Sequence, residues 1–325
     1  MSDRIRPDRN LALELVRTTE AAALAAARWL GRGDKNGADQ AAVDGMRAVL
    51  DGVEMDGLVV IGEGEKDEAP MLYNGEKIGN GQGPLTDIAV DPVDGTTLTA
   101  NGQGGAIAVI AVAERGSMYN PGPVVYMDKL AVGPAGAGIV DIRLPVDRNL
   151  TALAKAKGVA VRDLTAVVLD RPRHDDLIAQ IRGTGARIRL IRDGDVAGAI
   201  ATARPDSGVD ILFGVGGTPE GVITAAAMKC MGGDLQGRLF ARDPEERAAA
   251  EAEGYDFEQI LTMDDLVRSD DCFFAATGIS TGDLLRGVTY SQNRVHTQSL
   301  VMRSRSGTVR VIEADHSMEK MASII

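Results

Sequence analysis

Hydrophobic and polar positions follow two periods along the chain, one typical of helices and one typical of strands. Near the start, apolar residues recur at helical spacing and predict a helix over residues 9–30 that ends at Gly31 and Gly33. The residues expected on its buried face are Leu11, Leu13, Leu15, Val16, Ala23 and Leu24. A polar turn over residues 34–38 follows, and Asp39 then stands where a capping residue would begin a second helix at Gln40.

Short apolar runs further along predict strands. In the first half these runs cover residues 58–61, 87–90, 106–112 and 124–132. After a polar stretch near 145–162, predicted strands and helices alternate, with strands at 166–169, 187–191 and 209–213 and helices at 172–181, 196–203 and 219–231. This alternation predicts parallel βαβ units. The charged run 242–253 predicts a surface helix.

Composition narrows the possible partners. The chain has 325 residues, 44% hydrophobic and 25% charged, as in an ordinary globular protein with one large domain or two lobes. Aromatic residues make up 3% and the net charge is −12, which argues against binding nucleic acid or an anionic membrane. Cys230 and Cys272 lack metal spacing and are typical of buried hydrophobes in a reducing compartment. The polar amino terminus shows no signal segment, so we expect a cytoplasmic protein.

The strongest chemical signal lies at residues 91–96, which read Asp-Pro-Val-Asp-Gly-Thr directly after an apolar run. Pro92 cannot continue a strand ladder and Gly95 permits a sharp turn, so both carboxylates can point into one crevice. Asp91 and Asp94 would repel each other there unless a cation lay between them. Two plainer interpretations stay open, a hydrogen-bonded Asx turn and a helix cap formed by the threonines that follow.

Three further acids stand at the ends of predicted elements. Glu63 follows a predicted strand between two glycines, and Glu220 lies in the first turn of a predicted helix. Each acid also has a structural interpretation: a solvated acidic loop for Glu63, a favourable helix-dipole position for Glu220 and a helix cap for Asp39. Together with the two aspartates at residues 91 and 94 they form an oxygen-only ligand set, which suits Mg²⁺ or Mn²⁺ rather than zinc.

Several longer motifs accompany residues 91–96. They lie at residues 29–39, 60–73, 126–130, 171–175, 193–197, 214–222 and 276–285. The motif Asp-Pro-[Ile/Leu/Val]-[Asp/Glu]-[Gly/Ser]-[Thr/Ser] marks the lithium-sensitive, metal-dependent sugar phosphatase superfamily. Within that superfamily the chain resembles the class II fructose-1,6-bisphosphatases over nearly its whole length.

This resemblance implies a layered α/β/α/β/α sugar-phosphatase fold, with two mixed sheets sandwiched by helices. It also implies a phosphoric monoester hydrolase of gluconeogenesis that removes the 1-phosphate of fructose 1,6-bisphosphate. The implied cofactor is Mn²⁺ or Mg²⁺, and the implied metal ligands are Asp39, Glu63, Asp91, Asp94 and Glu220. Thr96 would activate the attacking water with Asp39 as its partner, and Lys35 and Asp67 would complete the catalytic residues.

The resemblance further implies a set of substrate contacts. These are Asp94, Gly95, Thr96, Tyr126, Arg171, Pro172, Arg173, Asp193, Gly194, Asp195 and Gly217. Arg171 and Arg173 can grip the phosphate that is not cleaved, although on their own they would also suit a solvated helix start. Asp193 and Asp195 can accept hydrogen bonds from sugar hydroxyls.

The chain departs from the family pattern at Asp94, because many class II enzymes carry Glu there. It also lacks the Trp-Asp motif of an inositol monophosphatase near Glu220, which favours the bisphosphatase. A haloacid-dehalogenase-type phosphatase is the rival enzyme, since Asp193 and Asp195 follow a predicted strand, but Ala197 stands where that family has Thr or Val. A non-catalytic sugar-phosphate sensor is the rival binding protein. Complete nucleotide-binding glycine motifs are absent from the sequence.

We expect two lobes packed closely as one unit, with the site between them. Residues 1–150 would form a metal-binding α/β lobe and residues 151–325 a substrate-binding α/β lobe. The expected partner is a small sugar bisphosphate, and the expected assembly is a homo-oligomer, either a dimer or a tetramer.

Overall fold

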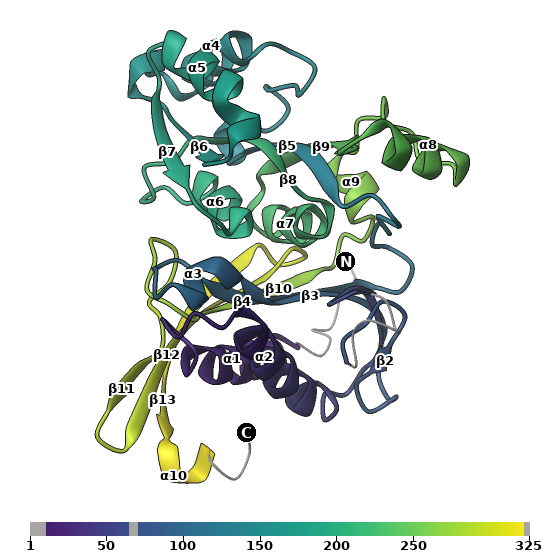
Figure 1. The fold of residues 1–325 in the computed structure, drawn as a ribbon, viewed down its shortest axis with the longest axis vertical. Coiled ribbons are helices and arrows are strands. Elements are labelled where there is room, and N and C mark those ends of the chain that lie inside the picture. Colours follow the sequence, from purple (N-terminus) through teal and green to yellow (C-terminus); the bar gives the residue numbers. More distant parts are fainter. Residues whose placement is uncertain (1–10, 65–70, 322–325) are drawn as a thin grey trace, which may run out of the picture.

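Two β-sheets alternate with layers of helices. The computed structural model describes residues 11–64 and 71–321. From bottom to top in Figure 1, helices α1 (Ala12–Ala27) and α2 (Lys35–Leu50) lie beneath the first sheet, and α6 (Asp195–Thr202) and α7 (Thr218–Met231) separate it from the second. Helices α4 (Val146–Lys157) and α5 (Asp175–Gly183) cover the outer face of the second sheet. The expected α/β/α/β/α layering is confirmed.

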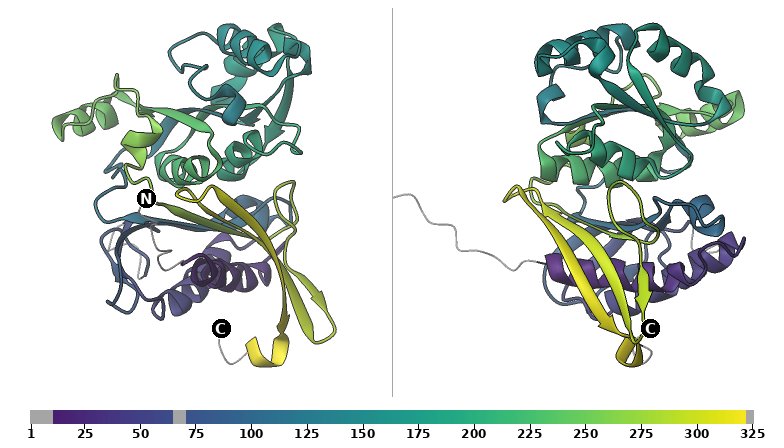
Figure 2. Two further views of the ribbon diagram at one scale, coloured as in Figure 1. Left: turned by 180° about the vertical axis from the view of Figure 1, so that it is seen from behind. Right: turned by 90° about the vertical axis from the view of Figure 1, so that its left-hand side faces the viewer.

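The first sheet is mixed and draws its strands from both ends of the chain. Its strands are β1 (Asp56–Ile61), β2 (Lys77–Ile78), β3 (Leu85–Asp94), β4 (Ile107–Glu114), β10 (Phe273–Gly278), β11 (Thr289–Ser291), β12 (Arg294–Arg303) and β13 (Thr308–Ser317). Their order is β11-β12-β10-β4-β3-β1-β2, with β13 paired to β12. Strands β1 and β3 are parallel, whereas β10 lies antiparallel to β4. Figure 2 shows the β12–β13 hairpin reaching away from the body of the protein.

The second sheet is also mixed. Its strands are β5 (Tyr126–Val132), β6 (Thr165–Leu169), β7 (Arg187–Ile191), β8 (Ile211–Gly217) and β9 (Asp234–Phe240), in the order β7-β6-β8-β5-β9. Strand β6 is parallel to β7 and β8, which confirms the predicted βαβ units. Because β5 belongs here and β10 to β13 return to the first sheet, the boundary between the sheets does not follow the division of the chain at residue 150.

Shorter elements connect these layers. They are α3 (Thr96–Ala100), α8 (Pro244–Ala252), α9 (Met263–Leu266), α10 (Met318–Met321) and the 3₁₀ turns η1 (Pro134–Gly136), η2 (Val161–Asp163) and η3 (Pro172–His174). The predicted surface helix at 242–253 is α8. No helix in the described ranges has both the length and the apolar content needed to cross a membrane.

Three details differ from the sequence-based expectation. Helix α2 begins at Lys35 and is capped by Asp34, whose carboxylate accepts a hydrogen bond from the Gly37 N–H at 2.9 Å. The predicted capping role of Asp39 is therefore wrong, because this residue lies inside the helix. Strand β3 runs through Pro92, since a register shift between residues 91 and 94 interrupts the ladder there. Leu13 is 64% exposed although its spacing placed it on the buried face.

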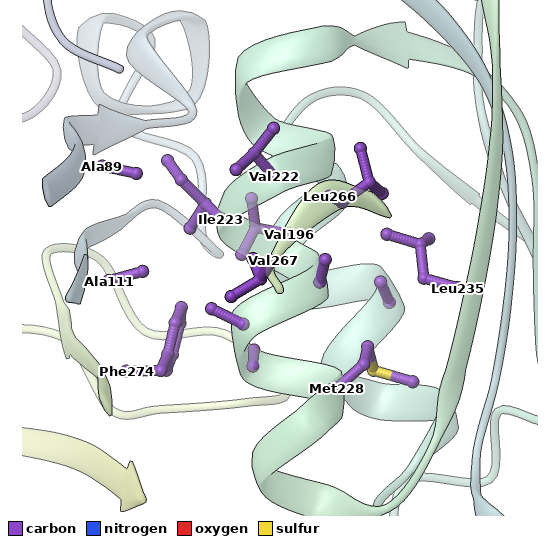
Figure 3. Close-up of a cluster of buried hydrophobic side chains, with 14 of the residues drawn as sticks. Ala89, Ala111, Val196, Val222, Ile223, Met228, Leu235, Leu266, Val267 and Phe274 are labelled. Carbon is purple, nitrogen blue, oxygen red and sulfur yellow. The ribbon is translucent and has the colours of Figure 1, made fainter. Parts of the chain in front are cut away.

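Helix α7 holds the two sheets together. Figure 3 shows Val222 and Ile223 near Ala89 and Ala111 of the first sheet, and Met228 on the side of Leu235. These side chains are almost entirely buried, as are the small alanines at 225–227 that allow close packing. Each fully buried aliphatic side chain contributes roughly 1.5–3 kcal/mol. The first turn of α7, which carries Glu220, is therefore firmly anchored between the sheets.

Close packing of α1 on α2 generates a prediction. A Cβ added at Gly45 would lie 2.8 Å from the carbonyl oxygen of Ala21, so Gly45→Ala should push the two helices apart. We expect a loss of about 1–3 kcal/mol in the free energy of unfolding, measured by urea denaturation. The matched control is Gly183→Ala at the end of α5, where nothing lies within 4 Å, and this variant should be neutral or stabilised by up to about 1 kcal/mol. Equal stabilities for the two variants would contradict this packing.

Candidate active site

Strand β3 brings two carboxylates to the boundary between the sheets. The Val93 N–H donates a hydrogen bond to the Asp91 carboxylate at 3.0 Å, within the register shift. Asp94 is 4% exposed, and its Oδ2 has no hydrogen-bond partner in the described structure. Gly95 then adopts a positive φ of 101°, which turns the chain into α3. The sequence-predicted turn therefore delivers both acids to one place.

Helix α7 supplies the third carboxylate. Glu220 lies in the first turn of the helix, and its Oε2 is buried without a hydrogen-bond partner among the described residues. A Cβ at Gly217 would overlap the Glu220 carboxylate, so glycine at the end of β8 allows the carboxylate to take this position. The Asp94 and Glu220 carboxylates thus each hold a buried oxygen that lacks a proton donor.

Asp39 and Glu63 complete the acidic group from the side of the first sheet. The Thr96 hydroxyl donates a hydrogen bond to the Val93 carbonyl oxygen at 3.2 Å. Burial raises the pKa of Asp39 to about 6, and the neighbouring Thr96 hydroxyl and the charge of Lys35 oppose the shift. Glu63 reaches solvent on one side, but desolvation by surrounding protein atoms, followed by the charges of Asp39 and Glu220, raises its pKa to about 7.

Burial and mutual repulsion act on the remaining acids as well. Burial raises the pKa of Asp91 well above its usual value, and the charges of Asp94, Glu220 and Glu63 raise it further. Burial likewise raises the pKa of Asp94 and of Glu220, and Asp195 adds to both shifts. All five predicted metal-binding acids are therefore in one electrostatic neighbourhood.

The chemistry of these residues fits a hard divalent cation. Their donors are all carboxylate oxygens, and the unpartnered oxygens of Asp94 and Glu220 require either a proton or a cation. Over residues 11–64 and 71–321, no three His, Cys, Asp or Glu side chains already converge as a formed metal centre. The acids are thus close enough to raise one another's pKa, although no three of them converge on one point within the described residues. The predicted residue Asp67 lies outside the described residues.

Contacts around α3 link the catalytic side to the predicted sugar site. The Lys35 ammonium donates to the Thr97 hydroxyl at 2.9 Å, and the Thr97 N–H donates to the Asp193 carboxylate at 3.3 Å. Asp193 is also 3.5 Å from a guanidinium nitrogen of Arg171. Gly194, which follows it, has a positive φ of 76° and lies against the Asp94 carboxylate. The sequence had not indicated the part played by Thr97.

The predicted phosphate-binding residues meet at the carboxyl ends of β6 and β8. Arg173 donates two hydrogen bonds to the Val215 carbonyl oxygen, at 3.2 and 2.7 Å. Its guanidinium carbon lies 5.3 Å from the centre of the Tyr126 ring, within cation–π range. Pro172 begins the short turn η3 that carries this arginine. Burial lowers the pKa of Arg173, as does the charge of Arg171, while the charge of Asp195 opposes the shift.

Lys129 is a site residue that the sequence reasoning missed. Its side chain is 2% exposed, and its ammonium lies 2.5 Å from the Asp195 carboxylate and 3.0 Å from the Gly217 carbonyl oxygen. Its charge opposes the pKa rise of the Asp94 and Glu220 carboxylates. The signal was available, because Lys129 lies two residues from Met127 and from Ala131 in β5 and therefore shares their buried face.

A cavity of about 530 Å³ borders the site. It lies between the sheets next to Asp193 and Gly194, and its walls include residues of α6 and of the loop after β10. The five acids are not among the residues that line it, so the cavity adjoins the acidic site rather than containing it.

Comparison with known proteins decides the family. The family model described as "Bacterial fructose-1,6-bisphosphatase, glpX-encoded" matches residues 9–316. The chain belongs to this family. The bisphosphatase relatives include "Fructose-1,6-bisphosphatase 1 class 2" of Escherichia coli (strain K12), which is 48% identical over 96% of each chain. "Fructose-1,6-bisphosphatase class 2" of Shigella flexneri is also 48% identical over 96% of each chain.

A solved structure outside these bisphosphatases is also similar. The extragenic suppressor protein suhB from Bartonella henselae matches at 19% identity and a TM-score of 0.33, over 61% of this chain and 74% of that one. The fold is defined by the sheets and layers described above. The class II bisphosphatase family consists of metal-dependent phosphatases, which agrees with the oxygen-only ligand set.

The raised pKa values predict how the stability of this bisphosphatase depends on pH when divalent cations are removed. Each acid has a folded pKa above its unfolded value, so the metal-free protein should lose stability as pH rises through the raised values, about 6 for Asp39 and about 7 for Glu63. In chelator, the thermal midpoint should therefore fall as pH rises from about 4, near the unfolded pKa values, to about 7, the raised pKa of Glu63. Added Mn²⁺ or Mg²⁺ should raise the midpoint at neutral pH.

The matching variant is Asp94→Asn, which removes one of the repelling charges. It should flatten the loss of stability in chelator and gain less from added cation than the parent protein. Asp163→Asn is the control, because this acid is exposed and lies in η2 on the second sheet's side. An Asp94→Asn variant that responds to pH and cation like the parent would contradict the electrostatic account.

Proposed function

We propose that this chain hydrolyses the 1-phosphate of fructose 1,6-bisphosphate to give fructose 6-phosphate and phosphate. The observation that carries the proposal is the meeting of acids from the first sheet, α2 and α7 beside Thr96, with Arg173 and Tyr126 at the adjoining strand ends of the second sheet. One end of this arrangement suits a cation-bound phosphate, and the other suits a phosphate held by arginine. The names of the relatives support the same substrate.

The chemical step depends on how Thr96 and Asp39 share a proton. The Thr96 hydroxyl can orient the attacking water, and the Asp39 carboxylate can accept the proton that the water loses. A carboxyl group with a pKa of about 6 is mostly ionised at neutral pH and is still basic enough to take up a proton. Mn²⁺ or Mg²⁺ held by the five acids would supply positive charge to the attacking and leaving oxygens.

Residues at the strand ends of the second sheet can bind the sugar and the phosphate that is not cleaved. The Arg173 and Arg171 guanidiniums can bind the 6-phosphate, and the Tyr126 ring beside Arg173 can close one side of that site. Asp193 and Asp195 can accept hydrogen bonds from sugar hydroxyls. Lys129 holds the Asp195 carboxylate in place for this purpose, because the two side chains form a buried ion pair.

The rival phosphatase mechanism, with Asp193 as a nucleophile, is not favoured by its surroundings. The Asp193 carboxylate is already engaged by the Thr97 N–H and by Arg171. A covalent phosphate on Asp193, trapped during turnover, would favour the rival, since water is the nucleophile in our scheme. A sugar-phosphate sensor would bind the bisphosphate without releasing phosphate.

The cytoplasmic location of the protein and its assembly as a dimer or tetramer stay predictions.

Cation removal tests the proposed chemistry. We expect phosphate release from fructose 1,6-bisphosphate to stop in chelator and to return when Mn²⁺ or Mg²⁺ is added back. The reason is that the side chains proposed to surround the reacting phosphate are mostly carboxylates, which would repel it without a cation. A colorimetric phosphate assay with and without added cation measures this. Full activity after complete chelation would defeat the proposal.

Two substitutions separate catalysis from binding. Thr96→Ala should lower kcat by roughly 10²-fold or more with little change in KM, whereas Thr96→Ser, which keeps the hydroxyl, should retain most of the activity. Arg173→Ala should mainly raise KM, because the arginine contacts a phosphate that does not react. Arg182→Ala on the exposed face of α5 is the control for loss of a nearby arginine. The reverse pattern of kcat and KM would contradict these roles.

A further inference from the structure

A buried histidine joins two strands of the second sheet beside the phosphate-binding arginine. His174 is 2% exposed. Its Nδ1 lies 2.7 Å from the Leu169 carbonyl oxygen at the end of β6, and its Nε2 accepts a hydrogen bond from the Val215 N–H of β8 at 2.8 Å. Because the Val215 N–H is a donor, Nε2 must be unprotonated, and the ring proton is on Nδ1.

The imidazole stands where the ladder between β6 and β8 has ended. The paired positions of these strands are Ala166 with Ile211 and Val167 with Leu212. Beyond them the strands separate, and the His174 ring bonds a carbonyl group on one strand and an N–H group on the other. It therefore acts as a polar wedge at the carboxyl ends of two parallel strands, where ligands bind in such sheets.

Gly214 makes room for this wedge. It has a positive φ of 121°, and a Cβ built on it would lie 2.9 Å from the His174 Nε2. A side chain at residue 214 would therefore be strained and would push the ring away from Val215.

Arg173 contacts the same residue of β8, Val215, at its carbonyl group. Its guanidinium donates both of its hydrogen bonds to the Val215 carbonyl oxygen, while the imidazole of the next residue accepts from the Val215 N–H. One peptide segment of β8 thus fixes the arginine, and the histidine fixes that segment relative to β6. The arginine lies where it can stack on Tyr126 because of this arrangement.

We propose that His174 is a positioning residue for the phosphate that is not cleaved, acting through Val215 and Arg173. This inference rests on the proposed function. Burial lowers the pKa of His174, as do the charges of Arg173 and Arg171, while the hydrogen bond to Leu169 and the charge of Asp128 oppose the shift. The ring is accordingly neutral at neutral pH, which is the form that can accept from the Val215 N–H.

The test compares two substrates that differ by the 6-phosphate. His174→Asn should raise KM for fructose 1,6-bisphosphate roughly tenfold with kcat within about twofold, because the shorter side chain cannot reach the Val215 N–H. Its kcat/KM for fructose 1-phosphate, which has no 6-phosphate, should stay at the parent value. His174→Gln can place an amide oxygen near the position of Nε2 and should recover part of the lost affinity.

A double variant shows whether the effect passes through the arginine. In the Arg173→Ala background, His174→Asn should add little to KM for the bisphosphate. Asn149→Ala is the stability control. The buried Asn149 side chain on α4 forms hydrogen bonds with the backbone of Asp141 and Leu144, in the loop before this helix. This variant should lower the thermal midpoint without changing either KM.

The outcomes separate this inference from the function on which it rests. If Arg173→Ala does not reduce the preference for the bisphosphate, the assignment of the arginine fails and the inference fails with it. If Arg173→Ala reduces the preference and His174→Asn does not, the inference alone is overturned. Equal losses on both substrates in His174→Asn, or a full additional loss in the double variant, would also overturn it.

Discussion

Carboxylates from the first sheet and from the helix layer between the sheets lie near enough to raise one another's pKa. Asp91, Asp94 and Glu220 are each pushed toward the protonated form by burial and by neighbouring negative charge. Such a group is unfavourable by itself and persists only where the surrounding packing fixes it. Here the buried face of α7 between the two sheets provides that packing (Figure 3). Keeping these carboxylates together costs folding stability, which is what a site proposed to bind cations requires.

The same constraint explains the unusual backbone around the site. The register shift in β3, the left-handed Gly95 and the crowded Gly217 each let a carboxylate approach where a regular strand or a larger residue would block it. Lys129 offsets part of the negative charge from within the protein. On the second sheet, the imidazole of His174 bonds two strand ends, so the proposed phosphate-binding side is also built by polar contacts between separated strands.

Sequence patterns predicted the parts of this structure that depend on local order. The Asp-Pro-Val-Asp-Gly-Thr turn, the βαβ alternation and the position of Glu220 all follow from neighbouring residues. Two aspartates five positions apart, Asp34 and Asp39, both precede a helical pattern, and only packing decides which one caps α2. Long-range pairing could not be predicted either. The return of β10 to β4 and the ion pair of Lys129 with Asp195 join residues that are distant in the chain.

The central claim is that these acids from separate elements hold divalent cations together. Anomalous diffraction from a crystal soaked in Mn²⁺ tests it most directly, because manganese can be located independently of the protein atoms. The account predicts anomalous peaks within bonding distance of the Asp91, Asp94 and Glu220 oxygens. Saturating manganese that leaves no peak among these carboxylates, in crystals of active protein, would contradict it.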